Sequence, residues 1–158
     1  MKRITLIIVM MLLGLTSSAQ KQSENGFTDI ITPDTTLNKF MMYWLRKPYK
    51  LGGNTEKGID CSQFNKRLYM DVYGLNLENI CYKQWNQTIR LKQDSLITGD
   101  LVFFRSKLSP SGWHCGVFIG QTYFIHAANR YEGVKISSLN EPRYMNSIRG
   151  FGRLKQVK

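Results

Sequence analysis

Apolar residues in the first part of the chain recur at helical spacing. The first such stretch follows Asp34 and Thr35, either of which can cap the start of a helix, and Lys47-Pro48 is expected to end it. The apolar positions of this stretch are Leu37, Phe40, Met41, Tyr43, Trp44 and Leu45. Residues 49–58 contain three glycines and show no regular pattern, so they are predicted to form an irregular loop.

A second helix is predicted to begin at Cys61. The apolar residues Phe64, Leu68 and Val72 recur at every fourth position and would lie on one helical face. Gly74 suits the C-terminal stop of this helix, because glycine readily adopts a left-handed backbone conformation.

Beyond a looser segment at residues 81–85, the pattern changes to short apolar runs bounded by turn residues. These runs cover residues 101–104, 115–119, 123–127, 134–136 and 148–154. Residues 120–122 would join the second and third runs as a hairpin. Helices followed by an antiparallel meander of strands indicate the α+β class, with the N-terminal helices packed on the sheet.

The start of the chain has the pattern of an export signal. A cationic opening, Met1–Arg3, precedes an apolar run at residues 4–15, and small residues occupy positions 17–19. A membrane anchor is the alternative interpretation, but this run is shorter than the roughly 20 residues that span a bilayer. We therefore expect residues 1–19 to be a cleaved signal peptide.

The rest of the chain divides into two parts. Residues 20–33 are polar and are predicted to be a flexible leader, and residues 34–158 are predicted to form one domain. The mature protein would be exported to the periplasm or the extracellular space, with no stable membrane insertion after signal cleavage.

The chain carries a strong excess of positive charge. Lys and Arg number 22 against 11 acidic residues, and loss of the signal peptide would leave a net charge of +9. A basic exported protein is attracted to polyanions such as the carboxylates of peptidoglycan. Nucleic acid is not an expected partner, because the basic residues are scattered and no RNA-binding pattern is present. The sequence leaves the oligomeric state open.

Cys61 lies where the first turn of a helix is predicted. The unpaired amides and the positive dipole end of a helix favour the thiolate, which is the reactive form of cysteine. For an exported cysteine, a disulfide partner or a small buried hydrophobe is an equally reasonable interpretation on position alone.

The only two histidines of the chain, His114 and His126, lie on neighbouring strands of the predicted hairpin. Side chains alternate between strand faces, so both rings reach one face if the connecting loop has an odd number of residues, as 120–122 would provide. A cysteine, a histidine that takes its proton and a second polar ring that orients the first form a nucleophile, base and orienter.

Five short motifs occur in order along the chain. They are Tyr49-x-x-Gly52-Gly53, Asp60-Cys61-Ser62, Gly99-Asp100-Leu101-Val102-Phe103-Phe104, His114-x-Gly116-Val117-Phe118-Ile119-Gly120 and Phe124-Ile125-His126-Ala127. In residues, order and spacing they resemble the NlpC/P60 peptidases over roughly residues 35–155. The resemblance implies a papain-like α+β domain that hydrolyses peptidoglycan peptides, commonly next to D-glutamate or diaminopimelate.

The resemblance also implies roles for individual residues. Cys61 would be the nucleophile, His114 its general base and His126 the group that orients the His114 ring. The Tyr49 hydroxyl would lie beside the oxyanion. Asp60 and Ser62 match positions that face the substrate in relatives, although either side chain can instead cap the helix.

Several positions depart from the family pattern. Gln63 replaces a small residue, and Asn79 and Cys81 stand where an arginine and a serine are common, which leaves the substrate specificity open. Cys81 is expected at the pocket. Cys115 should face away from His114 as a small core residue, and no disulfide is expected.

The histidines and cysteines are too scattered along the chain to predict a closed zinc site, and no phosphate-binding loop is present. Neither a metal nor a cofactor is therefore expected. The sequence predicts a secreted cysteine peptidase that cuts the D-glutamyl to diamino-acid bond or a cross-link of peptidoglycan. The alternatives are an N-acetylmuramoyl-L-alanine amidase type of wall hydrolase or antibacterial toxin, and a catalytically silent wall-binding module.

Overall fold

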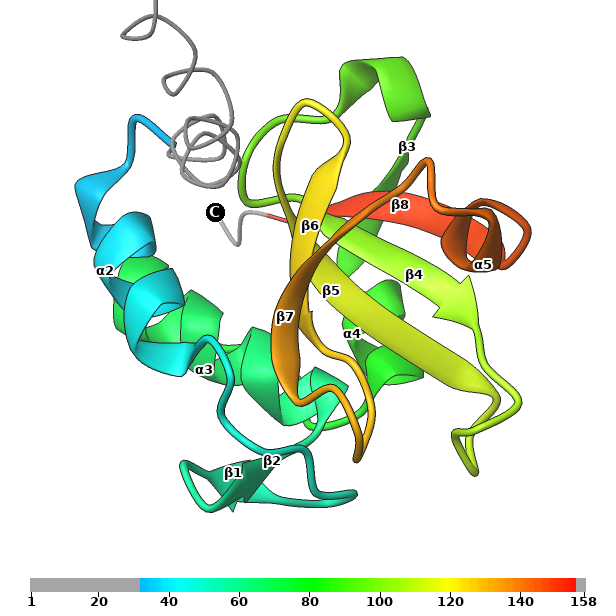
Figure 1. The fold of residues 1–158 in the computed structure, drawn as a ribbon. Coiled ribbons are helices and arrows are strands. Elements are labelled where there is room, and N and C mark those ends of the chain that lie inside the picture. Colours follow the sequence, from blue (N-terminus) through cyan, green and yellow to red (C-terminus); the bar gives the residue numbers. More distant parts are fainter. Residues whose placement is uncertain (1–31, 156–158) are drawn as a thin grey trace, which may run out of the picture. The chain divides into compact units, whose positions relative to one another are not determined.

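A six-stranded antiparallel sheet lies at the centre of the computed structural model, which describes residues 32–155 (Figure 1). In spatial order its strands are β3 (Thr88–Leu91), β8 (Ile148–Leu154), β4 (Leu101–Arg105), β5 (Trp113–Gly120), β6 (Tyr123–Ala127) and β7 (Val134–Ser138). The predicted signal peptide, 1–19, and most of the predicted leader, 20–33, lie outside the described residues. No helix within residues 32–155 is long and apolar enough to cross a membrane.

The predicted meander is confirmed for four strands, β4 to β7, each of which pairs with the next in chain order. Strand β8 then returns to the other side of β4, and β3 pairs with β8 at the edge of the sheet. The sequence did not predict β3. This edge strand has four residues and leaves Ile89 and Arg90 exposed, so it carries little apolar pattern.

Helix α2 (Thr35–Trp44) begins at one of its two predicted caps. Asp34 Oδ1 accepts hydrogen bonds from the amides of Thr36 and Leu37 at 2.9 and 3.0 Å, which satisfies two amides that have no partner within the helix. The buried face of α2 consists of Leu37, Phe40, Met41 and Trp44. The helix ends before Lys47, because Leu45 already leaves the helical conformation.

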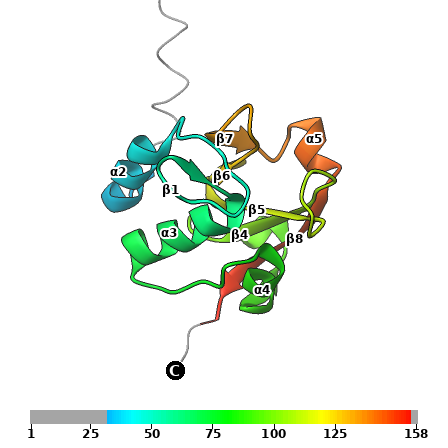
Figure 2. The ribbon, with the colours of Figure 1, turned by 90° about the horizontal axis from the view of Figure 1, so that it is seen from below.

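Helix α3 (Cys61–Tyr73) has the predicted bounds. Asp60 caps its start, and Gly74 ends it in the left-handed conformation with a φ of 66°. Phe64 and Leu68 are fully buried, and α3 packs against β5 and β6. Figures 1 and 2 show α2 and α3 together on one side of the strands and α5 (Pro142–Met145) on the other.

Two segments without a regular sequence pattern contain secondary structure. At the predicted irregular loop, β1 (Asn54–Thr55) and β2 (Gly58–Ile59) pair as a short antiparallel hairpin. The looser segment at 81–85 forms α4 (Cys81–Asn86). Periodicity could not reveal these elements, because strands of two residues and a helix of less than two turns are too short to show a repeat.

One face of the sheet is covered by a largely aromatic cluster. Its buried members are Val102, Phe104, Phe118, Phe124, Leu139, Tyr144 and Phe151. The ring of Phe124 lies 5.0 Å from that of Phe104 and 4.9 Å from that of Tyr144, between ring centres. This packing holds β4, β6 and α5 together, and it forms the wall against which the polar groups of the site lie.

Candidate active site

The two histidines of the hairpin β5–β6 lie on the same face, as predicted. The connection differs from the expected three-residue loop, since β5 reaches Gly120 and only Gln121 and Thr122 form the turn. With the two-residue turn alone, the numbers of opposed residues would have an odd sum, and the two histidines would lie on opposite faces. A register shift between Phe118 and Gly120 adds one residue to β5, so that opposed residues such as Val117 and Ile125 again have an even sum. The Nε2 atom of His114 and the Nδ1 atom of His126 are consequently 2.7 Å apart.

His126 is wholly buried, and polar groups contact both of its ring nitrogens. Its Nε2 lies 3.1 Å from Ser137 Oγ and 3.3 Å from the Tyr144 hydroxyl. Burial, followed by the nearby charge of His114, holds the pKa of His126 well below its usual range, so this ring is neutral. We assign the tautomer from this network: Nε2–H donates to Ser137, and Nδ1 accepts from His114.

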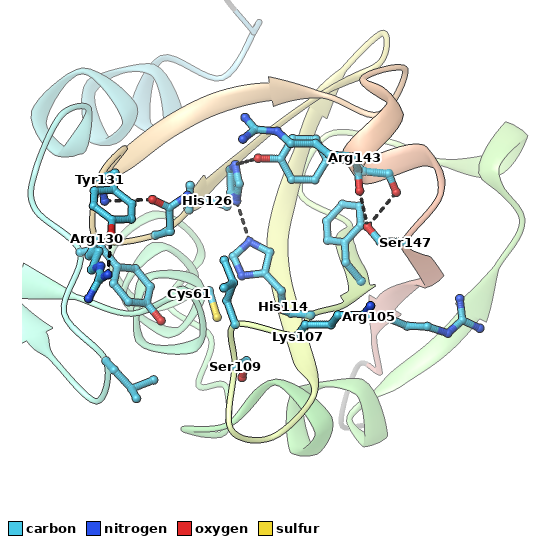
Figure 3. A pocket seen from close by; sticks show the side chains of 18 residues that line it. Cys61, Arg105, Lys107, Ser109, His114, His126, Arg130, Tyr131, Arg143 and Ser147 are labelled. Carbon is cyan, nitrogen blue, oxygen red and sulfur yellow. Dashed lines mark hydrogen bonds between the residues drawn. The ribbon is translucent and has the colours of Figure 1, made fainter.

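Cys61 is the first residue of α3 and lines a pocket beside His114. Figure 3 shows the His114 ring between the Cys61 sulfur and His126. Hydrogen bonds from the thiols of Cys115 and Cys81, together with the charge and hydrogen bond of His114, hold the pKa of Cys61 well below its usual range, against the effect of burial. These contacts favour the thiolate, as does the N-terminal end of α3.

Tyr49 lines the same pocket as Cys61 and is partly buried. Burial, and then the negative charge of Cys61, raise the pKa of the Tyr49 phenol. The hydroxyl therefore stays protonated in the working range of pH and is available as a hydrogen-bond donor in the pocket.

Asp60 and Ser62 hold the start of α3 in place. Asp60 Oδ1 accepts hydrogen bonds from the Gln63 amide and the Ser62 hydroxyl, both at 2.8 Å, and its Oδ2 accepts one from the Gly52 amide at 2.9 Å. Ser62 Oγ also lies 2.7 Å from the carbonyl oxygen of Asn79. The structure shows the capping role for Asp60, whereas the Ser62 side chain contacts the cap and the Asn79 carbonyl rather than capping the helix. Contact of either residue with a substrate remains a prediction.

The pocket has a volume of about 680 Å³ and is rich in cationic side chains. Arg105 and Lys107 lie on one side of the Cys61–His114 pair, and Arg130 lies on the other (Figure 3). Arg143 also lines the pocket, where it forms an ion pair with Glu132 at 3.0 Å. The site thus presents positive charge around a nucleophile and its base.

One cysteine, Cys81, lies elsewhere than the sequence suggested, and all three lie close together. Cys81 was expected at the pocket, but it is 3% exposed and packs behind Cys61 with 3.5 Å between the sulfur atoms. Cys115 is a buried core residue on β5, as predicted, yet its sulfur also reaches this pair. All three sulfurs lie within 4.8 Å of one another. The cysteines are scattered along the sequence but close together in the fold, so the expectation that they are too scattered to share a site is wrong. All three are free thiols.

Sequence reasoning missed Ser137 and Tyr144, which contact His126. The predicted strand stopped at residue 136, whereas β7 continues to Ser138 and pairs Ser137 with Phe124. Extending the strand by two residues would have placed Ser137 on the face of His126. Tyr144 lies on α5, a single turn of helix whose sequence has no periodic signal.

The groups at the site form a continuous line of contacts from thiol to imidazole, second imidazole and hydroxyl. Such a line can transfer the proton of Cys61 to His114 and stabilise the imidazolium that results. The Tyr49 hydroxyl and the amides at the start of α3 are donors that can face a developing oxyanion.

The chain as a whole resembles several known proteins. Residues 46–153 match the NlpC/P60 family. The murein DD-endopeptidase MepS/murein LD-carboxypeptidase of Escherichia coli strain K12 is 37% identical over 132 residues, covering 82% of this chain and 69% of that protein. The probable endopeptidase NlpC of the same strain is 33% identical over 135 residues, covering 85% of this chain and 87% of the relative.

Solved structures show the same fold. An NlpC/P60 family protein from Bacillus cereus superimposes with a TM-score of 0.68 at 28% identity, and the match covers 79% of this chain. It spans only 41% of that protein. The NlpC/p60 domain of the peptidoglycan hydrolase SagA gives a TM-score of 0.61 at 24% identity, covering 77% of this chain and 97% of that domain. The expected papain-like α+β fold is confirmed.

Proposed function

The chain belongs to the NlpC/P60 family of cysteine peptidases, and we propose that it hydrolyses peptide bonds in peptidoglycan stem peptides, at the D-glutamyl to diamino-acid bond or at a cross-link. One relative is named as a murein DD-endopeptidase and another as a probable endopeptidase, and both names support the reaction class. The observation that carries the proposal is the line of contacts that runs from Cys61 through His114 to the buried His126.

In the proposed reaction, the thiolate of Cys61 attacks the carbonyl carbon of the scissile bond. The proton of the thiol has moved to His114, which then delivers it to the departing amine. His126 accepts the hydrogen bond of His114 Nε2 and so keeps the other nitrogen of that ring directed at Cys61 and the leaving group. Water then attacks the acyl-enzyme, with His114 as base, and releases the new carboxylate.

The negative oxygen that forms during each attack needs donors. Tyr49 is suited to this task, because its raised pKa keeps the hydroxyl protonated beside a thiolate. The backbone amide of Cys61 would be the second donor. Tyr49 belongs to the pocket wall, and the Cys61 amide belongs to the first turn of α3, which Asp60 fixes in place.

The charge of the pocket suits an acidic peptide. Peptidoglycan stem peptides carry carboxylates on D-glutamate and on the diamino acid, and Arg105, Lys107 and Arg130 bring positive charge to the pocket around the nucleophile. The net charge of the chain, +11, has the same sign. These features support a peptidoglycan substrate over a neutral peptide.

Export is the second part of the proposal. Residues 1–19 would direct the chain out of the cytoplasm and be removed after Ala19, and residues 34–158 would act as the catalytic domain in the periplasm or outside the cell. N-terminal sequencing of the protein recovered from its native host would test this step. A product that retains Met1 and is extracted with the membrane would contradict it.

Digestion of purified sacculi distinguishes the candidate functions. Mass spectrometry of the soluble products should show fragments cut within the stem peptide, and Cys61→Ala should yield none. Whole stem peptides freed from the glycan would indicate an amidase instead. Tight binding to sacculi without any product, by wild type and Cys61→Ala alike, would indicate a wall-binding module.

A further inference from the structure

Two further sulfur atoms, each from a separate element, lie close to the sulfur of the proposed nucleophile. Cys61 begins α3, Cys81 begins α4 and Cys115 lies on β5, and their Sγ atoms all lie within 4.8 Å of one another. The Cys61 and Cys81 sulfurs are 3.5 Å apart. The proposed hydrolysis needs only one of these thiols.

The spacing of the sulfurs matches that of metal ligands. Thiolates bind soft metals at about 2.3 Å, which places three sulfurs around one ion about 4 Å apart. The distances in the cluster are of this size, so an ion can be accommodated by small rotations of the three side chains. Within residues 32–155, the group of ligand atoms at this spacing contains no imidazole nitrogen and no carboxylate.

We propose that Cys61, Cys81 and Cys115 form a binding site for Cu(I). The donor set consists of three soft sulfurs, which select soft ions. Zn(II) in a closed protein site takes four ligands, and this cluster offers three.

The site is buried but has an entrance. Cys115 is 0% and Cys81 is 3% exposed, while Cys61 is 7% exposed and lines the pocket, so an ion would reach the cluster through the Cys61 sulfur. Binding is a substitution without electron transfer: Cu(I) enters, copper–sulfur bonds form, and protons of the coordinating thiols leave to solvent. The sulfur of Cys115, which also lies 3.5 Å from Gln84 Oε1, would turn toward the ion.

Copper at this site would stop hydrolysis, since the sulfur of Cys61 cannot both bind the ion and attack a carbonyl. This consequence rests on the proposed function, whereas binding itself depends on the three thiols alone. The inhibition would be reversible, because binding does not oxidise the sulfurs and a chelator that removes the ion leaves three free thiols, which take up protons again from solvent.

The binding test is an anaerobic titration of the full mature chain with Cu(I) in competition with the chelator bathocuproine disulfonate. We expect one ion per chain, with a copper–sulfur signal from three sulfurs in X-ray absorption. Cys81→Ser and Cys115→Val should each weaken binding by more than the roughly 10- to 100-fold that loss of an outer partner of a metal site causes. His114→Gln keeps all three thiols and should bind copper as wild type does. Equal affinity in Cys115→Val, or preference for Zn(II) in the same titration, would overturn the proposal.

The activity test separates this site from the proposed function. Each protein serves as its own reference on purified sacculi, with and without one equivalent of Cu(I). Wild type should lose activity with copper and regain it with the chelator, while Cys115→Val should keep its own rate at that copper concentration. One bound copper in a chain that never cleaves sacculi would refute the hydrolase and leave the copper site standing. Cleavage unaffected by stoichiometric copper would refute the site.

Discussion

The Nε2 atom of His114 lies 2.7 Å from Nδ1 of His126, a ring that has no exposed surface. Because burial keeps His126 neutral, the proton between the two rings stays on His114, and His126 Nδ1 accepts the hydrogen bond. The two histidines therefore have unequal tasks: one transfers a proton, and the other determines how the first is oriented.

This inequality predicts a graded series of rates on purified peptidoglycan. Cys61→Ala should abolish turnover, and His114→Ala should lower kcat/KM by about 10²- to 10⁴-fold, the range for loss of a general base. His126→Gln should retain more activity than His126→Ala, because the amide oxygen can still accept from His114. Circular dichroism would check the folding of each variant. Full activity in His114→Ala would contradict the mechanism.

The buried neutral ring of His126 also predicts a pH dependence of stability. An unfolded histidine takes up a proton near pH 6.5, whereas native His126 does not, so the unfolded chain binds more protons as the pH falls below about 7. The free energy of unfolding should decrease by up to about 1.4 kcal/mol per pH unit from this group. Urea unfolding between about pH 7 and pH 5.5 would measure the slope. His126→Gln should show a smaller slope, and an equal slope would contradict the assignment.

Gly116 allows the two histidine strands to approach each other. A Cβ atom there would lie 2.8 Å from the Phe124 ring, 2.9 Å from the Ile125 carbonyl oxygen and 3.0 Å from His126 Cβ. Gly116→Ala should therefore displace His126 and lower the activity. The free energy of unfolding should decrease by about 1–3 kcal/mol, the usual cost of overpacking. Gly74→Asn is the control, because its site is open and asparagine tolerates a positive φ. An unchanged melting temperature in Gly116→Ala would contradict the claim that the close approach of the two strands requires a glycine at this position.

Asp100 is 2% exposed and receives two hydrogen bonds of 2.8 Å from the guanidinium of Arg153. Removing the arginine leaves a buried carboxylate without its cation, so Arg153→Met should lower the free energy of unfolding by about 3 kcal/mol. Adding Asp100→Asn should recover part of the loss. Arg149→Met on the same strand loses a contact with the Trp113 ring and an exposed 3.5 Å hydrogen bond to the Gly112 carbonyl oxygen, and it should cost less than about 1 kcal/mol. Equal losses from the two arginines would contradict this prediction.

The three cysteines are predicted to remain reduced in the folded protein. Denaturation and alkylation without a reductant should add three labels to the intact mass, since all three thiols are free in the fold. An oxidised chain would instead be two hydrogens lighter and carry one label. The close approach of Cys61 and Cys81 makes that pair the one to examine if a disulfide is found.

Long elements with strong patterns could be predicted from the sequence. Helix α3 was predicted from apolar residues at every fourth position, a cysteine at its start and Gly74 at its stop, and its bounds agree with the structure. The placement of the two histidines on one face could be predicted from the alternation of side chains along a strand. The loop length assumed for it was wrong, and the result depends on a register shift in β5 that the sequence did not reveal.

Elements and contacts that depend on distant parts of the chain could not be predicted in this way. Cys61, Cys81 and Cys115 are brought together by the packing of α3 and α4 on β5, and no local pattern encodes that packing. Tyr144 reaches His126 from a single helical turn, eighteen residues further along the chain. Short elements such as α4 have too few residues for a periodic signal, so their existence follows from tertiary contacts.

The register shift between Phe118 and Gly120 limits how this hairpin can change during evolution. The extra residue on β5 and the two-residue turn together give the even offset that brings His114 and His126 to one side of the sheet. An insertion or deletion of a single residue in this turn would rotate every later side chain of β6 to the opposite side unless a second change compensated it. In active relatives, the length of this hairpin should therefore differ by an even number of residues. Where it differs by an odd number, a bulge should have been gained or lost as well.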